Sequence, residues 1–161
     1  MQSELSIRPI KESDNPGIAH VIRTVMPEFG ASGAGFAIHD PEVDTMYESY
    51  QHKAAYFVIE KDGSILGGGG IAPLSDGPEY YCELKKMYFL PEARGKGLAT
   101  ILLNRCLEAA RELGYTHCYL ETFKTMETAI SVYHHFGFTP LNGPIGNTGH
   151  FSCTHFFEKE L

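Results

Sequence analysis

Apolar and polar residues follow two different periodicities along this chain. Helix-start residues and apolar residues spaced three or four apart predict helices after Glu12–Asn15, from Pro41 to about Tyr50, over Gly97–Leu113 and over about Met126–Phe136. Alternating or continuous apolar runs predict strands over Glu4–Ile10, Ala54–Glu60, Ile65–Leu74, Tyr80–Leu90, His117–Thr122 and Phe151–Leu161. The order β-α-α-β-β-β-α-β-α-β predicts an α/β fold, and no linker or repeat divides residues 1–161, so we expect one domain.

Two loops and one glycine run interrupt this pattern. The small residues of 30–36 and the Pro/Gly/Asn-rich segment Leu141–Gly149 predict loops, whereas Lys61–Ser64 is typical of a hairpin. The strand after that hairpin contains Gly67–Gly70, which weakens a strand. Two interpretations stay open: a flexible or bulged strand, or a bare backbone that lets an acceptor or cofactor lie close.

Composition limits the classes of function. The 161 residues suffice for one domain that buries roughly 70% of its unfolded surface, and 43% hydrophobic with 20% charged residues is ordinary for a globular protein. A net charge of −7 argues against a nucleic-acid partner. No apolar run approaches the ~18 residues of a membrane span, and the polar start Met1–Arg8 lacks a signal-peptide core. We therefore expect a cytoplasmic protein without a membrane partner.

Cysteine and histidine carry no metal signature. The four cysteines are widely spaced without a C-x-x-C pair, which favours reduced thiols and no disulfides. The eight histidines form no zinc motif, and the pair His134-His135 is expected at the surface or beside a cofactor. We expect no metal site.

The segment Arg94-Gly95-Lys96-Gly97-Leu98-Ala99 lies between a strand and a long helix. Backbone N–H groups at a helix start have no intrahelical partner and point toward the positive end of the helix dipole. The two glycines let the backbone approach a bulky anion, and Arg94 and Lys96 add positive charge. The segment therefore predicts a phosphate-binding loop.

Two familiar phosphate loops do not fit. A P-loop needs Ser or Thr after Gly-Lys, and this sequence has Gly97 there. A dinucleotide loop needs a third glycine, and this sequence has Thr100. The remaining match is [RQ]-x-x-G-x-[GA], which resembles the pyrophosphate loop of the GCN5-related N-acetyltransferase (GNAT) family.

Flanking segments extend the resemblance to about residues 80–140. The strand Cys82–Phe89 resembles the central strand of that family, and Ala129–Phe138 resembles its last helix, A-x-x-x-Y-x-x-x-G-F. The resemblance implies a GNAT fold, with a mixed and mostly antiparallel sheet flanked by helices. It implies acetyl-coenzyme A as co-substrate and an amine as acceptor, and a homodimer is common in the family.

The resemblance also implies roles for particular residues. The coenzyme A pyrophosphate would bind the loop from Arg94 to Thr100. The pantetheine arm would pair with the backbone of Met87, Tyr88 and Phe89, and an N–H near Met87 would polarise the thioester carbonyl. Many family members carry Asn where this chain has Met126, whose side chain offers no amide. Thr125 or Thr128 would have to supply the contact with the co-substrate instead.

Catalysis would need an acid and a base. Tyr133, in the family's helix motif, is the expected general acid for the coenzyme A thiolate. Glu121 at the end of its strand is the first candidate base, because one branch of the family has a similar acid before its tyrosine. Glu83 on the central strand is the rival candidate.

Two hypotheses about function follow. The first is an enzyme that acetylates a primary amine of a small molecule or of a peptide N-terminus, with acceptor choice set by loops 30–36 and 141–150. The second is a non-catalytic module that senses acyl-coenzyme A. The sequence does not name the acceptor.

Overall fold

A computed structural model of the chain describes residues 4–161, so the expectation for Met1–Ser3 lies outside it. The strands are β1 (Ser6–Pro9), β2 (Ala55–Lys61), β3 (Ser64–Pro73), β4 (Tyr81–Phe89), β5 (His117–Thr122), β6 (Thr139–Leu141) and β7 (His155–Glu160). The α-helices are α1 (Asn15–Glu28), α2 (Met46–Ser49), α3 (Leu98–Glu112) and α4 (Glu127–His135). Short 3₁₀ turns occupy Glu12–Asp14, Ala37–His39, Pro41–Asp44 and Pro91–Ala93.

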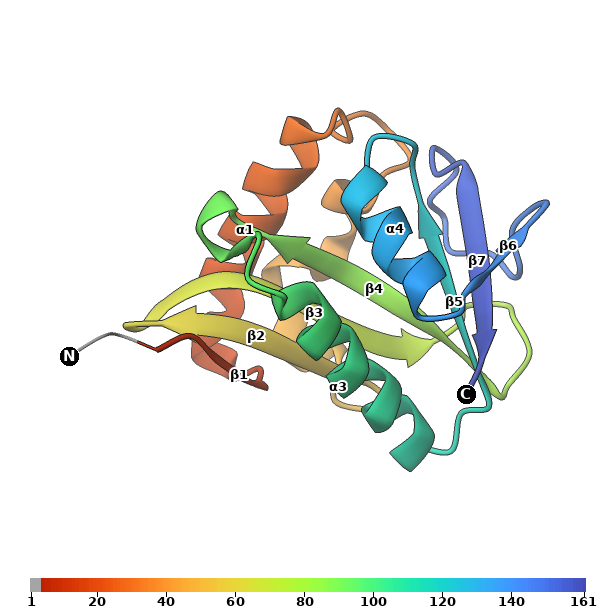
Figure 1. Cartoon of the computed structure of the whole chain (residues 1–161), viewed down its shortest axis with the longest axis horizontal. Helices are drawn as coiled ribbons and strands as arrows, with labels where there is room; N and C mark the ends of the chain where they lie inside the picture. Colours follow the sequence, from red (N-terminus) through yellow and green to blue (C-terminus); the bar gives the residue numbers. More distant parts are fainter. Residues whose placement is uncertain (1–3) are drawn as a thin grey trace.

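One sheet of seven strands, in the order β1-β2-β3-β4-β5-β7-β6, separates two helical layers. Helices α3 and α4 cover one face and α1 with α2 the other, as Figure 1 shows. Each layer buries its own apolar cluster, with Leu102 and Leu107 of α3 in one and Ile18 and Ile22 of α1 in the other. Most residues of the apolar stripes predicted from the sequence face the sheet, whereas Ile101 and Leu113 of the stripe predicted over Gly97–Leu113 are exposed.

The strands β4 and β5 form the one parallel pair among the strand pairings of residues 4–161, and they pair over only three positions, from Tyr81 with His117 to Glu83 with Tyr119. Beyond these positions the strands diverge, and α4 lies over the opening (Figure 1). Residues that follow Glu83 on one strand and Tyr119 on the other therefore face a gap in the sheet.

A β-bulge lies in β4 beside this opening. Gly68 pairs with Tyr88 and Gly70 with Lys85, so that Lys86 and Met87 together oppose one residue of β3. Lys86 adopts a φ of 50°, and its carbonyl accepts a 2.6 Å hydrogen bond from the Tyr56 hydroxyl. The bulge breaks the alternation of side chains at this point of the strand.

Gly67–Gly70 is explained by the packing of the chain itself. A Cβ at Gly68 would meet Tyr56 and Ile18, and a Cβ at Gly69 would meet Met87 and Leu102. The bulge beside this run lies in the neighbouring strand β4, and the run itself packs closely against side chains of the chain. The space that a side chain would need is filled by residues from both helical layers.

Three predicted elements differ from the structure. The helix predicted from Pro41 to Tyr50 is a 3₁₀ turn followed by the single turn of α2, because the backbone at Thr45 leaves the helical conformation (φ −131°, ψ 43°). The final strand begins at His155 and not at Phe151, because residues 150–153 turn away to contact residues 34–40. The sheet gains the short strand β6, which pairs with β7 where a loop was predicted to begin.

Membrane insertion by a helix has no support in residues 4–161. None of the helices there has both the length and the apolar composition to cross a bilayer.

Replacing Gly70 by alanine will destabilise the fold. The new Cβ would press against the Ala55 carbonyl oxygen and lie 2.6 Å from the Tyr56 ring. We expect the free energy of unfolding in urea to fall by about 1–3 kcal/mol. The matched control is Gly143→Ala, where no atom lies within 4 Å of the added Cβ. Equal stability of the two variants would contradict the packing explanation.

Candidate active site at the opening between β4 and β5

A small cavity of about 40 Å³, here called the strand cavity, fills the opening between β4 and β5. Its walls carry ionisable groups from β4, β5, α4 and the loop before β7, among them Glu83, Lys85, Lys86, Glu121, Tyr133, His150 and Cys153. The three catalytic residues predicted from the sequence, Tyr133, Glu121 and Glu83, are therefore brought together at one place.

Glu83 is a buried acid without a hydrogen-bond partner among residues 4–161, and it is only 4% exposed. Its pKa is raised to about 7, chiefly by burial, while Lys85 opposes this shift and the like charge of Glu121 adds to it. His150 and Lys86 lower the pKa by smaller amounts. A carboxyl with this pKa can accept a proton near neutral pH.

Glu121 is held more firmly than Glu83. Its carboxylate accepts a 2.6 Å hydrogen bond from the Tyr119 hydroxyl and another from the Thr148 hydroxyl. The side chain is 4% exposed. Burial, and then the hydrogen bond to Glu121, raise the pKa of Tyr119. Glu121 is thus a fixed negative charge beside Glu83.

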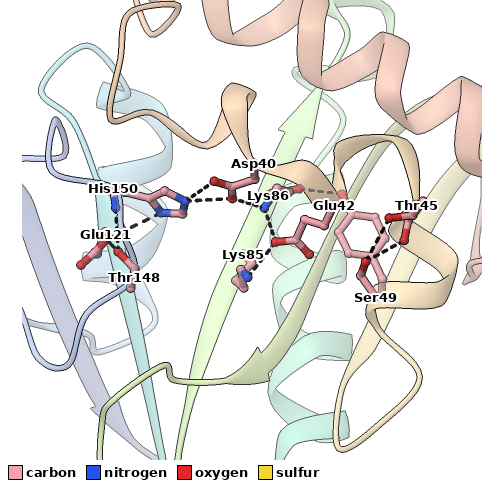
Figure 2. A network of polar contacts seen from close by, with 10 residues as sticks. Asp40, Glu42, Thr45, Ser49, Lys85, Lys86, Glu121, Thr148 and His150 are labelled. Carbon is pink, nitrogen blue, oxygen red and sulfur yellow. Dashed lines mark hydrogen bonds and ion pairs between the residues drawn. The ribbon is translucent and has the colours of Figure 1, made fainter.

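His150 belongs to the site, although no pattern in the sequence marked it beyond its place at the end of the predicted loop. Its Nε2 lies 2.8 and 3.0 Å from the two carboxylate oxygens of Asp40. Its Nδ1 lies 3.8 Å from the Glu121 carboxylate. Figure 2 shows the imidazole bridging the two acids.

Two lysines continue the network on the other side of Asp40 (Figure 2). The Lys86 ammonium, 1% exposed, lies 2.7 Å from Asp40 and 2.6 Å from Glu42. Lys85 donates to the same Glu42 at 2.9 Å. Consecutive side chains of a regular strand point to opposite faces, so the β4 bulge is what lets both lysines reach one carboxylate.

The positively charged and hydrogen-bonding groups around Asp40 lower its pKa by more than burial raises it. Burial by itself would raise the pKa of Asp40, but the hydrogen bond from His150 and the charge of Lys86 lower it to about 2. Asp40 is therefore ionised throughout the neutral range, and it ties the loop before α2 to β4 and to the loop before β7.

The donor atoms of Glu83, Glu121 and His150 lie within 4.8 Å of one another. Among the described residues they are the group whose spacing would suit a metal ion, which the sequence did not predict. The same spacing suits an ammonium group that donates hydrogen bonds to the two carboxylates.

A second hollow, here called the α4 groove, has a volume of about 380 Å³ and lies between β4, α4 and the end of α1. Most of the residues predicted to contact coenzyme A line it: Met87, Tyr88, Phe89, Arg94, Gly95, Ala99 and Met126. It meets the strand cavity at three shared residues, Met87, Tyr88 and Met126. The other predicted contacts do not line the groove and form the loop and the first turn of α3: Lys96, Gly97, Leu98 and Thr100.

The loop before α3 has the geometry expected of an anion site. Gly95 and Gly97 both have a φ of 73°, and no atom lies within 4 Å of where their Cβ atoms would stand. Within residues 4–161, no backbone N–H from Gly95 to Thr100 has a hydrogen-bond partner. These groups lie at the positive end of the helix dipole of α3 and are free to bind a phosphate.

Arg94 is occupied differently from the sequence prediction. Its guanidinium forms an ion pair with Glu28 of α1 at 2.5 Å, donates to the Phe89 carbonyl at 3.0 Å, and lies over the Phe29 ring. A phosphate bound at the loop would have to compete with Glu28 for this side chain.

The start of α4 resolves which threonine faces the groove. Thr125 donates a 2.6 Å hydrogen bond to the Phe29 carbonyl, whereas Thr128 lines the α4 groove. Met126 stands between the groove and the strand cavity and lines both. Of the two threonines, Thr128 is therefore the one that borders the α4 groove.

Tyr133 is buried on α4, at 6% exposure, and its ring contacts Phe138 and Phe157 edge-on or tilted. Burial raises the pKa of its hydroxyl, so the group stays protonated at neutral pH. The adjacent His134 and His135 are exposed. All four cysteines are free, and Cys153 is the one that is not buried.

Residues 21–138 match the sequence model of the Acetyltransferase (GNAT) family. The Escherichia coli (strain K12) protein named Uncharacterized N-acetyltransferase YjgM is 45% identical over 157 residues, which are 96% of this chain and 94% of that protein. An IAA acetyltransferase of Azospirillum brasilense is 35% identical over 106 residues, covering 66% of this chain and 67% of its own. The chain belongs to the GNAT family of acetyltransferases, which confirms the resemblance found in its sequence.

Solved structures agree on the fold. A GNAT-family acetyltransferase from Staphylococcus aureus Mu50 superposes with a TM-score of 0.86 at 18% identity, covering 98% of this chain and 99% of that one. A phosphinothricin acetyltransferase from Sinorhizobium meliloti, solved in complex with acetyl-CoA, has a TM-score of 0.75 at 18% identity, with 98% and 88% covered. The predicted GNAT fold is confirmed.

Replacing Asp40 by asparagine will change how stability depends on pH. The folded-state pKa of about 2 lies below the ordinary 3.8, so Asp40 stabilises the fold above about pH 4, and this stabilisation is lost as the pH falls toward 2. We expect Asp40→Asn to lower the free energy of unfolding by about 1 kcal/mol at pH 6, and by less at pH 3.

Urea unfolding at both pH values measures this difference. The control is Glu108→Gln, because Glu108 is exposed on α3 and should leave both values unchanged. A stability loss for Asp40→Asn that grows as the pH falls would contradict the charge arrangement.

Proposed function

We propose that the protein is an acetyl-CoA-dependent N-acetyltransferase that transfers the acetyl group directly to a primary amine. The observation that carries this proposal is the junction at Met87, where the α4 groove leading from the glycine loop meets the strand cavity with its two buried acids. A donor in the groove and an amine in the cavity would meet there. We also propose that the chain is one domain, since both apolar clusters pack on the same sheet.

The proposed binding mode uses the free backbone groups of two segments. The N–H groups from Gly95 to Thr100 would hold the pyrophosphate of the co-substrate, and Arg94 would leave Glu28 to join them. The backbone of β4 from Met87 to Phe89 faces the gap left by β5, so it would pair with the pantetheine arm. A backbone N–H at Met87 would stabilise the negative charge that develops on the thioester oxygen.

We propose Glu83 as the proton acceptor and Glu121 as the residue that tunes it. The sequence ranked Glu121 first, but Tyr119 and Thr148 already donate to that carboxylate. Glu83 has no such partner in the part of the chain that the structure describes, and its pKa of about 7 suits a base near neutral pH. The fixed charge of Glu121 helps to keep that pKa high.

The proposed step conserves atoms and protons. The ammonium group loses a proton to Glu83, and the free amine nitrogen attacks the thioester carbonyl carbon. The carbon–sulfur bond breaks, and Tyr133 donates its hydroxyl proton to the leaving sulfur. The proton held by Glu83 returns to solvent. The second proton, which the nitrogen loses as it becomes an amide, restores the Tyr133 hydroxyl, so that one proton is released overall.

The pH dependence of kcat/KM tests the base. Protonated Glu83 cannot accept a proton, so we expect kcat/KM to fall below about pH 7. Glu121→Gln removes a like charge, which lowers the pKa of Glu83 and moves the acid-side fall in kcat/KM to lower pH. Glu83→Gln should lower kcat/KM by about 100-fold or more. The same amine serves for every variant, so its own ionisation cancels.

Charged and titratable groups from every neighbouring element surround Glu83 and influence the pH dependence of kcat/KM. They are Lys85 and Lys86 of β4, Asp40 and Glu42 near α2, Glu121 of β5 and His150 before β7. The control is Glu108→Gln on the exposed face of α3, which should reproduce the wild-type profile. A Glu121→Gln profile that coincides with that of the wild type, or moves to higher pH, would rule out Glu83 as a base whose pKa is raised by Glu121.

Tyr133→Phe tests the general acid. The variant keeps the ring that packs on Phe138 and Phe157 but has no proton for the thiolate, so kcat should fall by about 100-fold. Free thiol release from acetyl-CoA measures the rate, and calorimetry should give an unchanged Kd for coenzyme A. The exposed Tyr80→Phe is the control. Full activity of Tyr133→Phe would remove this residue from the mechanism.

A further inference from the structure

The strand cavity has room for the amine head of an acceptor and for little else. Its volume is about 40 Å³, which corresponds to a few small heavy atoms. Glu83, more than nine-tenths buried, borders this space without a hydrogen-bond partner among residues 4–161. Glu121 lies beside it, with carboxylate oxygens of both acids within 4.8 Å. The space between the two acids is therefore suited to bind a small cation.

The two lysines of the site do not supply that cation. Lys86 is bound to Asp40 and Glu42, and Lys85 is bound to Glu42. These two cations thus balance Asp40 and Glu42, while Glu83 and Glu121 have no cation of their own in hydrogen-bond contact among the described residues 4–161. An ammonium group is the complement of two buried carboxylates at this distance.

The body of the acceptor must lie outside the cavity, and two hollows share three residues with it: the α4 groove, which the co-substrate would occupy, and a hollow beside the loop before β7. The latter, here called the tail groove, has a volume of about 460 Å³ and shares Glu121, His150 and Cys153 with the strand cavity. Its walls include Phe151 and Phe156 and contain no lysine or arginine. A different hollow beside Asp40 and Glu42 shares only Lys85 with the cavity.

We infer, on the basis of the proposed function, that the acceptor is a primary amine on an uncharged apolar or aromatic body. Its ammonium group binds between Glu83 and Glu121, and its body lies in the tail groove against Phe151 and Phe156. Amines that carry a carboxylate beside the amino group, as free amino acids do, are poor acceptors.

Charge explains the discrimination. A carboxylate one carbon from the amine would lie against Glu83 and Glu121. To form an ion pair, the carboxylate of such an acceptor would have to displace Asp40 or Glu42 from a lysine that is already paired and buried. Breaking a buried ion pair leaves an uncompensated charge, so binding is strongly disfavoured. An uncharged body meets no such opposition in the tail groove.

Matched pairs of acceptors test this inference. The compounds are 2-phenylethylamine against L-phenylalanine and 3-methylbutylamine against L-leucine, because each pair differs only by the carboxylate. The purified full chain receives acetyl-CoA and one acceptor, and mass spectrometry follows the acetylated product. We expect kcat/KM for each amine to exceed that of its amino acid by about 100-fold or more.

A variant tests the position of the body. Phe151 is 79% exposed, so Phe151→Ala should fold normally. We expect its KM for 2-phenylethylamine to rise about tenfold, with kcat and the Kd for coenzyme A unchanged and with the KM for ethylamine unaffected. Tyr80→Ala removes an exposed aromatic ring outside the grooves that adjoin the strand cavity and is the control. Phe156→Leu should raise the same KM.

The outcomes separate this inference from the proposed function. Equal or better transfer to the amino acids, transfer only to a peptide N-terminus, or an unchanged KM in Phe151→Ala would overturn the inference and leave the acetyltransferase intact. No transfer to any of the four compounds or to a peptide, although coenzyme A binds, would overturn both.

Discussion

Buried charge at the opening between β4 and β5 is the constraint on which the site depends. Ionised groups inside a protein need partners, and here the partners come from four distant parts of the chain: Asp40, Lys86, Glu121 and His150. Their contacts tie the loop before α2 and the loop before β7 to the two diverging strands. Glu83 is the acid that this network leaves unpartnered, and its position marks where an acceptor cation is expected.

Local patterns were sufficient to predict most elements of the fold and most of the residues that line the α4 groove on the β4 and loop side. The glycine loop before α3, the apolar faces of α1 and α3, and the strands β2–β5 were all predicted from neighbouring residues. Such features follow from helix-start chemistry and from periodicity, which act within a few residues. Tyr133, Glu121 and Glu83 were named through the family motif, and the structure brings them to one cavity.

Long-range contacts account for what the sequence could not predict. The β4 bulge depends on the glycine run of β3 packed between two helical layers, so no pattern within β4 could indicate that Lys85 and Lys86 reach one acid. His150 was missed because its partner Asp40 lies 110 positions earlier in the chain. The pairing of Arg94 with Glu28 likewise joins two elements that only the fold brings together.

Titration of the Glu83 carboxyl tests the central claim most directly, that this buried acid is the proton acceptor. Carbon-13 NMR of glutamate-labelled protein would follow the carboxyl resonance, with Glu83→Gln assigning it by its disappearance. We predict a pKa of about 7 for Glu83. A midpoint near the ordinary value of 4.5 would contradict the account, because the acid would then be a weak base in an open, solvated position.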